Sequence, residues 1–158
     1  MKKITILTLV LLLALLATAG TVFADGKRTF TAHLTAEAPG VETQAVGQAI
    51  FKVSKDGQSV DYKIIVANLD DITMAHIHWK PGGGDAPPVV WLLGPPPTLI
   101  AGTTNGVLVE GTFTASDFIG NLAGHSMEHL VEIFFAGEAY VNVHTSQYPG
   151  GEIRGNID

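Results

Sequence analysis

Apolar and polar residues alternate along most of this chain, and a repeat of two restricts it to β-structure. In the segment 29–36, Phe30, Ala32 and Leu34 alternate with threonines and His33. Successive side chains of a strand point to opposite faces, so this pattern is typical of a strand with one buried face. Similar segments lie at 46–53, 60–68, 72–79, 89–93, 106–113, 139–144 and 152–157. We therefore expect about seven or eight short strands.

Turn-forming residues separate these segments. Asp56-Gly57 gives a strong hairpin signal because aspartate and glycine tolerate the positive φ angles of tight turns. Asp70-Asp71 is interpreted as a further turn between two strands, 60–68 and 72–79. Prolines flank the segment 89–93, and proline cannot donate to a sheet, so we place that short strand at an edge.

One segment departs from the alternation and predicts a short helix over 126–136. Its apolar residues recur at the three- and four-residue spacing of a helix: Met127, Leu130, Val131 and Phe134. Ser126 can cap the start by accepting a hydrogen bond from a free backbone amide, and Gly137 can end the helix.

Together these elements predict an all-β fold: an antiparallel, immunoglobulin-like β-sandwich or barrel with one short helix near 126–136. No repeat or interdomain linker divides residues 25–158, which we interpret as a single domain. The chain contains no cysteine, so packing alone must stabilise it. A domain of this size buries enough surface to do so.

The first residues predict a secretory signal peptide over 1–24. Lys2 and Lys3 form a basic start, a leucine-rich run follows, and Val22-Phe23-Ala24 offers the small residues at which signal peptidase cleaves. We expect the protein to be secreted or otherwise extracytoplasmic, at the cell surface or in the periplasm. The alternative is an uncleaved anchor, because 4–24 is long enough to span a bilayer.

The charge of the chain bears on its partners. Its net charge of −6 repels phosphate backbones, so we expect no nucleic-acid partner. A membrane partner is expected only if the signal segment stays uncleaved. The remaining partners are a protein or a small ligand that the sequence does not identify.

Three histidines form the main candidate site. His76 and His78 are two apart and share a strand face, whereas Ala75 and Ile77 share the other, apolar face. The imidazoles are therefore predicted to point outward, and His144 does the same on its own strand. If those strands are neighbours, three imidazoles converge on one outer patch. Three neutral imidazoles can bind Zn²⁺ or Cu²⁺, with uptake weakening as the pH falls through about 6.5.

Other interpretations of this patch stay open. The histidines can instead be structural, hydrogen-bonded to the backbone or to a carboxylate such as Glu152, or they can take part in catalysis. Asn142 or Glu152 can orient a metal-bound ring by accepting its second N–H. Glu152 and Arg154 can also clamp a carboxylate ligand, or pair with each other to hold the last strand.

Standard catalytic motifs are missing from the sequence. There is no cysteine nucleophile and no Gly-x-Ser-x-Gly, and Gly82-Gly83-Gly84 lacks the lysine and following helix of a phosphate loop. The carboxylates of Asp70 and Asp71 point to opposite faces if both lie in a strand. We therefore do not expect an enzyme.

Two blocks of sequence resemble the CHRD domain, the module named after chordin. They are VANLDDITMAHIHWKPGGGDAPPVVWL (66–92) and AGEAYVNVHTSQYPGGEIRGNI (136–157), and the resemblance extends from about Arg28 to Ile157. Tyr148 departs from it, because the family usually carries asparagine or a similar polar residue there. The chain is similar to stand-alone secreted microbial members of this family.

The resemblance implies a fold more than a function. It implies an immunoglobulin-like barrel similar to that of copper/zinc superoxide dismutase, which also carries a His-x-His copper motif. No histidine lies between Trp79 and Gly124, so the second half of a dismutase site cannot form. We expect a non-enzymatic binding or matrix-type module. The alternative is a copper- or zinc-binding protein, either one that only binds the metal or one that also has oxidoreductase-like activity.

Overall fold

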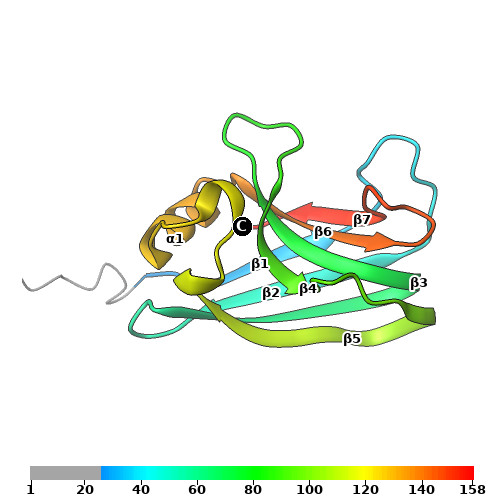
Figure 1. Ribbon diagram of the computed structural model, residues 1–158, viewed down its shortest axis with the longest axis horizontal. Helices are drawn as coiled ribbons and strands as arrows, with labels where there is room; N and C mark the ends of the chain where they lie inside the picture. Colours follow the sequence, from blue (N-terminus) through cyan, green and yellow to red (C-terminus); the bar gives the residue numbers. More distant parts are fainter. Residues whose placement is uncertain (1–25) are drawn as a thin grey trace, which may run out of the picture.

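A computed structural model describes residues 26–158 and shows a barrel-like, antiparallel seven-stranded sheet with one α-helix (Figure 1). The predicted signal peptide lies outside the described residues. The all-β prediction is confirmed. The elements are β1 (Thr29–Leu34), β2 (Val46–Val53), β3 (Ser59–Trp79), β4 (Pro88–Leu93), β5 (Ile100–Thr114), two 3-10 turns (Ala115–Asp117 and Gly120–Leu122), α1 (Met127–Phe135), β6 (Ala139–Thr145) and β7 (Ile153–Asn156).

The long strand β3 organises the sheet. Its first half pairs with β2 and β5, and its second half pairs with β6 and β4. Two segments predicted as separate strands, 60–68 and 72–79, are thus one strand of 21 residues, and the predicted turn at Asp70-Asp71 is wrong. The strand bends there through Asn68 and Asp71, whose φ angles are 56° and 47°. Asparagine and aspartate adopt this left-handed conformation more readily than most residues.

The sheet closes because β1 also pairs with the C-terminal strand. Thr31 and Asp158 exchange two backbone hydrogen bonds of 2.8 and 3.0 Å, and Thr35 and Arg154 exchange two more. At this seam a Cβ atom on Gly155 would overlap the backbone carbonyl of His33. Only glycine permits so close an approach of the two strands.

The helix α1 covers one end of the barrel (Figure 1). Ser126 caps it as predicted, because its side chain accepts a hydrogen bond from the amide of His129. The apolar face is buried, and Phe134 packs edge-on against Phe30 with ring centroids 5.3 Å apart. Within residues 26–158 no helix has the length and hydropathy needed to cross a membrane.

Two further boundaries differ from the predictions. The strand predicted at 106–113 is β5, which begins at Ile100 and ends at Thr114, because the bend in β3 allows pairing on both sides of it. The last strand begins at Ile153, which leaves Glu152 in the preceding loop. β4 pairs only with β3 among the named strands, so the predicted edge position is confirmed.

Candidate metal centre

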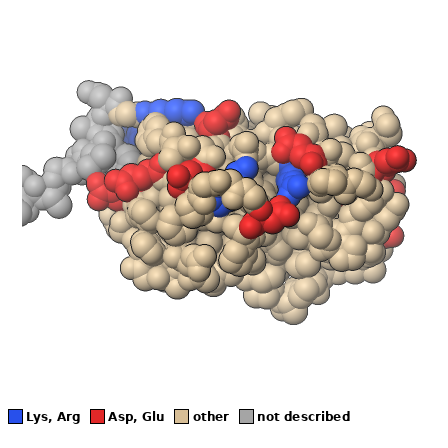
Figure 2. Space-filling model, turned by 90° about the horizontal axis from the view of Figure 1, so that it is seen from above, with Lys and Arg blue, Asp and Glu red and all other residues tan. Residues whose placement is uncertain are grey.

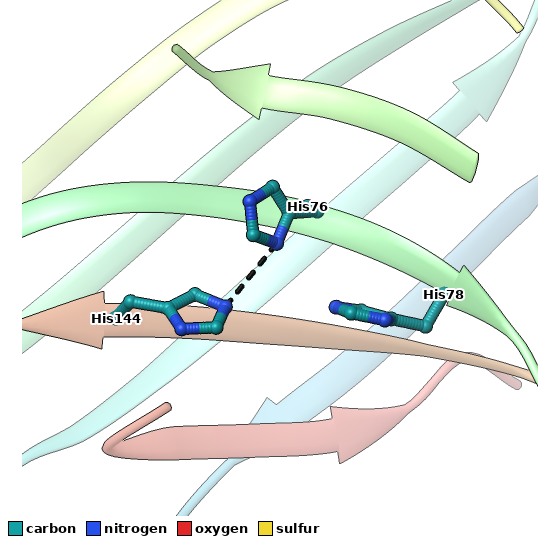
Figure 3. Close-up of side chains that lie close together, drawn as sticks. All are labelled: His76, His78 and His144. Atoms are coloured by element: carbon teal, nitrogen blue, oxygen red, sulfur yellow. Dashed lines mark hydrogen bonds between the residues drawn. The ribbon is translucent and has the colours of Figure 1, made fainter. Parts of the chain in front are cut away.

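The three predicted histidines come together. β3 and β6 are neighbours, with Met74 opposite His144 and His76 opposite Asn142. Each of the three imidazoles can offer one ring nitrogen such that these atoms all lie within 4.8 Å of one another. Figure 3 shows the rings of His76, His78 and His144 converging from the two strands.

The prediction that these imidazoles point outward needs correction. They lie on the face opposite the apolar core, yet His76 is only 4% exposed and His78 and His144 are each 6% exposed. Aromatic side chains enclose them: the ring of Trp91 packs edge-on against His76 at 4.4 Å, and Tyr140 stacks on His78 at 4.6 Å. Strand alternation fixes the face of a residue, but not what covers that face.

Backbone carbonyls orient two of the rings. Nδ1 of His78 lies 2.6 Å from the carbonyl oxygen of Ala86, and Nδ1 of His144 lies 2.8 Å from that of Pro149. A carbonyl can only accept, so in both rings Nδ1 carries the proton and donates. In the neutral rings the Nε2 atoms therefore keep their lone pairs. A metal-binding histidine is commonly held in this way.

Burial keeps the cluster neutral. Desolvation, together with the nearby His144 and His78, lowers the pKa of His76 to about 3. Desolvation also lowers the pKa of His78 and of His144, although in each case the hydrogen bond to a carbonyl partly opposes the shift. Imidazoles bind metal only when neutral, so these shifts move proton competition below the window near pH 6.5 that the sequence predicts.

The cluster does not satisfy its own hydrogen-bonding groups. Nε2 of His144 lies 3.2 Å from Nδ1 of His76, which is therefore the protonated nitrogen in this contact. Nε2 of His76 and Nε2 of His78 are buried without a hydrogen-bond partner among residues 26–158. Buried polar atoms normally have partners, and a bound cation would supply one for a lone pair.

Asn142 and Glu152 lie near the cluster but orient other groups. Asn142 donates to the carbonyl of Gly150, 3.1 Å away, and its Oδ1 has no partner among the described residues. The predicted hydrogen bond between a ring and Glu152 is not formed. This buried carboxylate instead accepts hydrogen bonds of 2.6 Å from Thr43 and from Thr145. It therefore ties the loop before β2 to β6.

Arg154 does not pair with Glu152 either. Its guanidinium forms an ion pair with Asp85, 2.7 Å away, in the loop that carries Ala86. The hydroxyl of Tyr140 also meets this loop, accepting a long hydrogen bond of 3.5 Å from the amide of Ala86. Both contacts hold the carbonyl that orients His78.

The sequence reasoning missed the carbonyls of Ala86 and Pro149 and the covering rings of Trp91 and Tyr140. A signal was present, since both carbonyls belong to proline- and glycine-rich loops inside the two blocks that resemble the family. Backbone groups carry no residue signature, however, so their direction follows only from the folded loops.

The remaining histidines lie elsewhere. His33 is exposed on β1. His129, in the first turn of α1, and His125, just before the helix, stack on each other with ring centroids 4.6 Å apart. Trp79 packs edge-on against both rings. Among residues 26–158, the only group of three or more potential ligand side chains close enough to hold one ion is His76, His78 and His144.

The structure thus defines a barrel-like β-domain with a buried three-histidine cluster at the seam between β3 and β6. A family model, the CHRD domain, matches residues 30–157. The chain therefore belongs to the CHRD family. No curated protein and no solved structure matches the chain. The predicted likeness to superoxide dismutase topology stays a prediction.

Proposed function

We propose that this protein is a secreted, extracytoplasmic, non-enzymatic CHRD module that binds one copper or zinc ion through His76, His78 and His144. The observation that carries the proposal is the chemistry of the cluster. Three buried imidazoles are kept neutral, and in two of them a backbone carbonyl fixes the proton on Nδ1. The lone pair on Nε2 of His78 then has no other partner in the described chain.

The donor set favours copper and zinc over other common metals. Imidazole nitrogens suit both ions, whereas calcium and magnesium prefer oxygen ligands, and no carboxylate belongs to the cluster. The general order of divalent affinities places Cu²⁺ above Zn²⁺ for nitrogen sites. We therefore expect tighter binding of copper.

Binding without turnover is favoured by the covering of the site. A catalytic metal keeps an open coordination position that substrate can reach. Here the three rings are at most 6% exposed and lie behind Trp91 and Tyr140. These contacts support a role in holding an ion rather than in processing a substrate, and we rank the copper-dependent oxidoreductase second for this reason.

Metal binding can be tested by tryptophan fluorescence, because the chain contains only two tryptophans and one of them lies against the cluster. In a Trp79→Phe variant of residues 25–158, Trp91 is the only tryptophan, and its ring contacts His76. We expect Cu²⁺ to quench its fluorescence with saturation at one equivalent, and Zn²⁺ to bind at the same stoichiometry in calorimetry. His33→Ala serves as the control and should behave like the parent. Absence of saturable binding near one equivalent would leave the histidines with a structural role.

Secretion is tested separately. The full-length chain, expressed in a bacterial host with an intact export pathway, should yield an extracytoplasmic product that begins at Asp25. Recovery of an uncleaved, membrane-bound chain would support the anchor instead.

A further inference from the structure

A pocket of about 370 Å³ opens beside the histidine cluster, and the proposed metal site does not use it. Lys80, Tyr140, Arg154 and Asn156 contribute to its lining, with Glu37 and Asp85 as its acidic members. Tyr140 is shared, because it lines this pocket and also stacks on His78. Figure 2 shows basic and acidic side chains gathered in the middle of the face seen from above.

The pocket holds more hydrogen-bond donors than its own acceptors use. Arg154 has five N–H donors, and its ion pair with Asp85 engages one guanidinium nitrogen, 2.7 Å from the carboxylate oxygen. Both residues line the pocket, but the side chain of Asp85 is 83% exposed and that of Arg154 only 20% exposed. The carboxylate is therefore the more solvated partner of this ion pair.

Lys80 adds a second positive charge. Its Nζ donates to Oδ1 of Asn156 at 2.6 Å and lies 5.2 Å from the centre of the Tyr140 ring. The guanidinium carbon of Arg154 lies 6.0 Å from the same ring. Glu37 forms no ion pair with either cation among residues 26–158, although it lines the same pocket. Both cations therefore lie close to the ring of Tyr140. Of the two carboxylates that line the pocket, only that of Asp85 forms an ion pair with either cation.

We infer that this pocket binds a carboxylate group. The planar guanidinium matches a carboxylate through paired N–H donors, and the ammonium group of Lys80 adds a second positive charge to the same pocket. The volume suits a small ligand or the last residues of a peptide. Glu37, Asp85 and the net charge of −6 disfavour an ion with two or more negative charges, such as phosphate at neutral pH.

The probe is N-acetylglycine, with N-acetylglycinamide as the uncharged match, titrated into isotope-labelled residues 25–158 and followed by amide chemical shifts. We expect saturable shifts at Lys80, Asp85 and Arg154 with the acid only. Lys80→Gln should weaken binding of the acid at least tenfold. Arg154→Lys keeps the positive charge but removes the paired N–H donors of the guanidinium, so it should weaken binding as well. Lys55→Gln, a matched change in an exposed hairpin turn, should leave it within twofold.

A further arm separates the sources of the carboxylate. Tighter binding of N-acetyltriglycine than of N-acetylglycine would assign the pocket to a peptide C-terminus, and equal binding would assign it to small free carboxylates. The inference is overturned if the amide binds as well as the acid, if inorganic phosphate binds more tightly than either, or if Lys55→Gln costs as much as Lys80→Gln. If Lys80→Gln binds copper as tightly as the parent protein, its weaker binding of N-acetylglycine reflects a change in the pocket and not in the histidine cluster.

Discussion

The molecule carries two groups of histidines beside a tryptophan, and they differ in the burial of their rings and in their hydrogen-bond partners. His76, His78 and His144 are buried behind Trp91, and two of their rings are fixed by backbone carbonyls. The other group, His125 and His129, stacks beside Trp79 at the surface, where the side chain of His129 remains 34% exposed. Nε2 of His129 is also buried without a hydrogen-bond partner in the described chain. The burial of whole rings and the backbone carbonyls, rather than residue type, therefore distinguish the candidate ligand set from this half-exposed pair.

The outer pair also has a different partner. Nδ1 of His129 lies 3.3 Å from a carboxylate oxygen of Glu132, one helical turn along α1. An exposed contact of this kind contributes little free energy. If the comparison is right, perturbing the inner group changes metal binding and perturbing the outer group does not.

The largest expected effect is the loss of a ligand. His144→Ala should weaken Cu²⁺ binding by roughly 100-fold or more, because even partners that only orient a metal ligand are worth about 10–100-fold. The double change His125→Ala and His129→Ala should leave affinity within about twofold. Isothermal titration calorimetry measures both. Equal losses in the two proteins would erase the distinction between the groups.

The second effect tests the carbonyl that orients His144. Gly151 has a φ angle of 111°, which residues with a Cβ rarely adopt, and a Cβ there would overlap the side-chain amide of Asn142. Gly151→Ala therefore strains the loop that carries Pro149. We expect a copper affinity about 10–100-fold lower and a loss of about 1–3 kcal/mol in the free energy of unfolding.

Gly137, with a φ angle of 66°, is the matched position at the end of α1, where a Cβ would meet open space. Gly137→Ala should cost about 1 kcal/mol in the free energy of unfolding and leave copper affinity unchanged. A weakening of copper binding by Gly137→Ala comparable to that by Gly151→Ala would contradict the role of the Pro149 loop.

The third effect is a pH dependence of stability without metal. The pKa of His76 is about 3 in the folded chain and near 6.5 when unfolded, so the unfolded state binds more protons between these values. The contribution of the neutral His76 ring to the free energy of unfolding is therefore fully present above pH 6.5 and is lost as the pH falls toward 3. His76→Gln should reduce the slope of unfolding free energy between pH 6 and 4 by up to about 1.4 kcal/mol per pH unit.

The control for this slope is His125→Gln, in the exposed pair. Urea denaturation in the presence of a chelator, repeated at each pH, gives the slopes. Identical slopes in the parent chain and in His76→Gln would mean that His76 is protonated as easily in the folded as in the unfolded chain.

The smallest effect concerns the N-terminal cap of α1, the helix that carries His129. Ser126→Ala removes the side-chain acceptor for the amide of His129 and should cost about 1 kcal/mol of stability. Copper affinity should not change, because α1 contributes no ligand. Denaturation and calorimetry on the same preparation check both statements. A lowered affinity would reveal coupling between the helix and the buried cluster.

Much of the fold was predictable because alternation and capping are local. The strands at 29–36 and 46–53, the edge strand at 89–93 and the cap at Ser126 follow from side-chain periodicity and hydrogen-bonding groups within a few residues. The errors arise at Asn68 to Asp71, where turn-forming residues bend β3 without ending it. Pairing with β5 continues through this bend as far as Ile72, where pairing with β6 begins, and this keeps the strand continuous. Such pairing partners are distant in sequence.

The sequence by itself determined that His76 and His78 share one face and that His144 faces the same way on its own strand, because alternation is a property of every extended chain. Only the tertiary structure decided that β3 and β6 are neighbours, and that Trp91 and Tyr140 bury the rings. It also decided which nitrogens carry protons, through carbonyls of two loops. Desolvation and ring orientation depend on groups brought together from distant parts of the chain, and no local pattern records them.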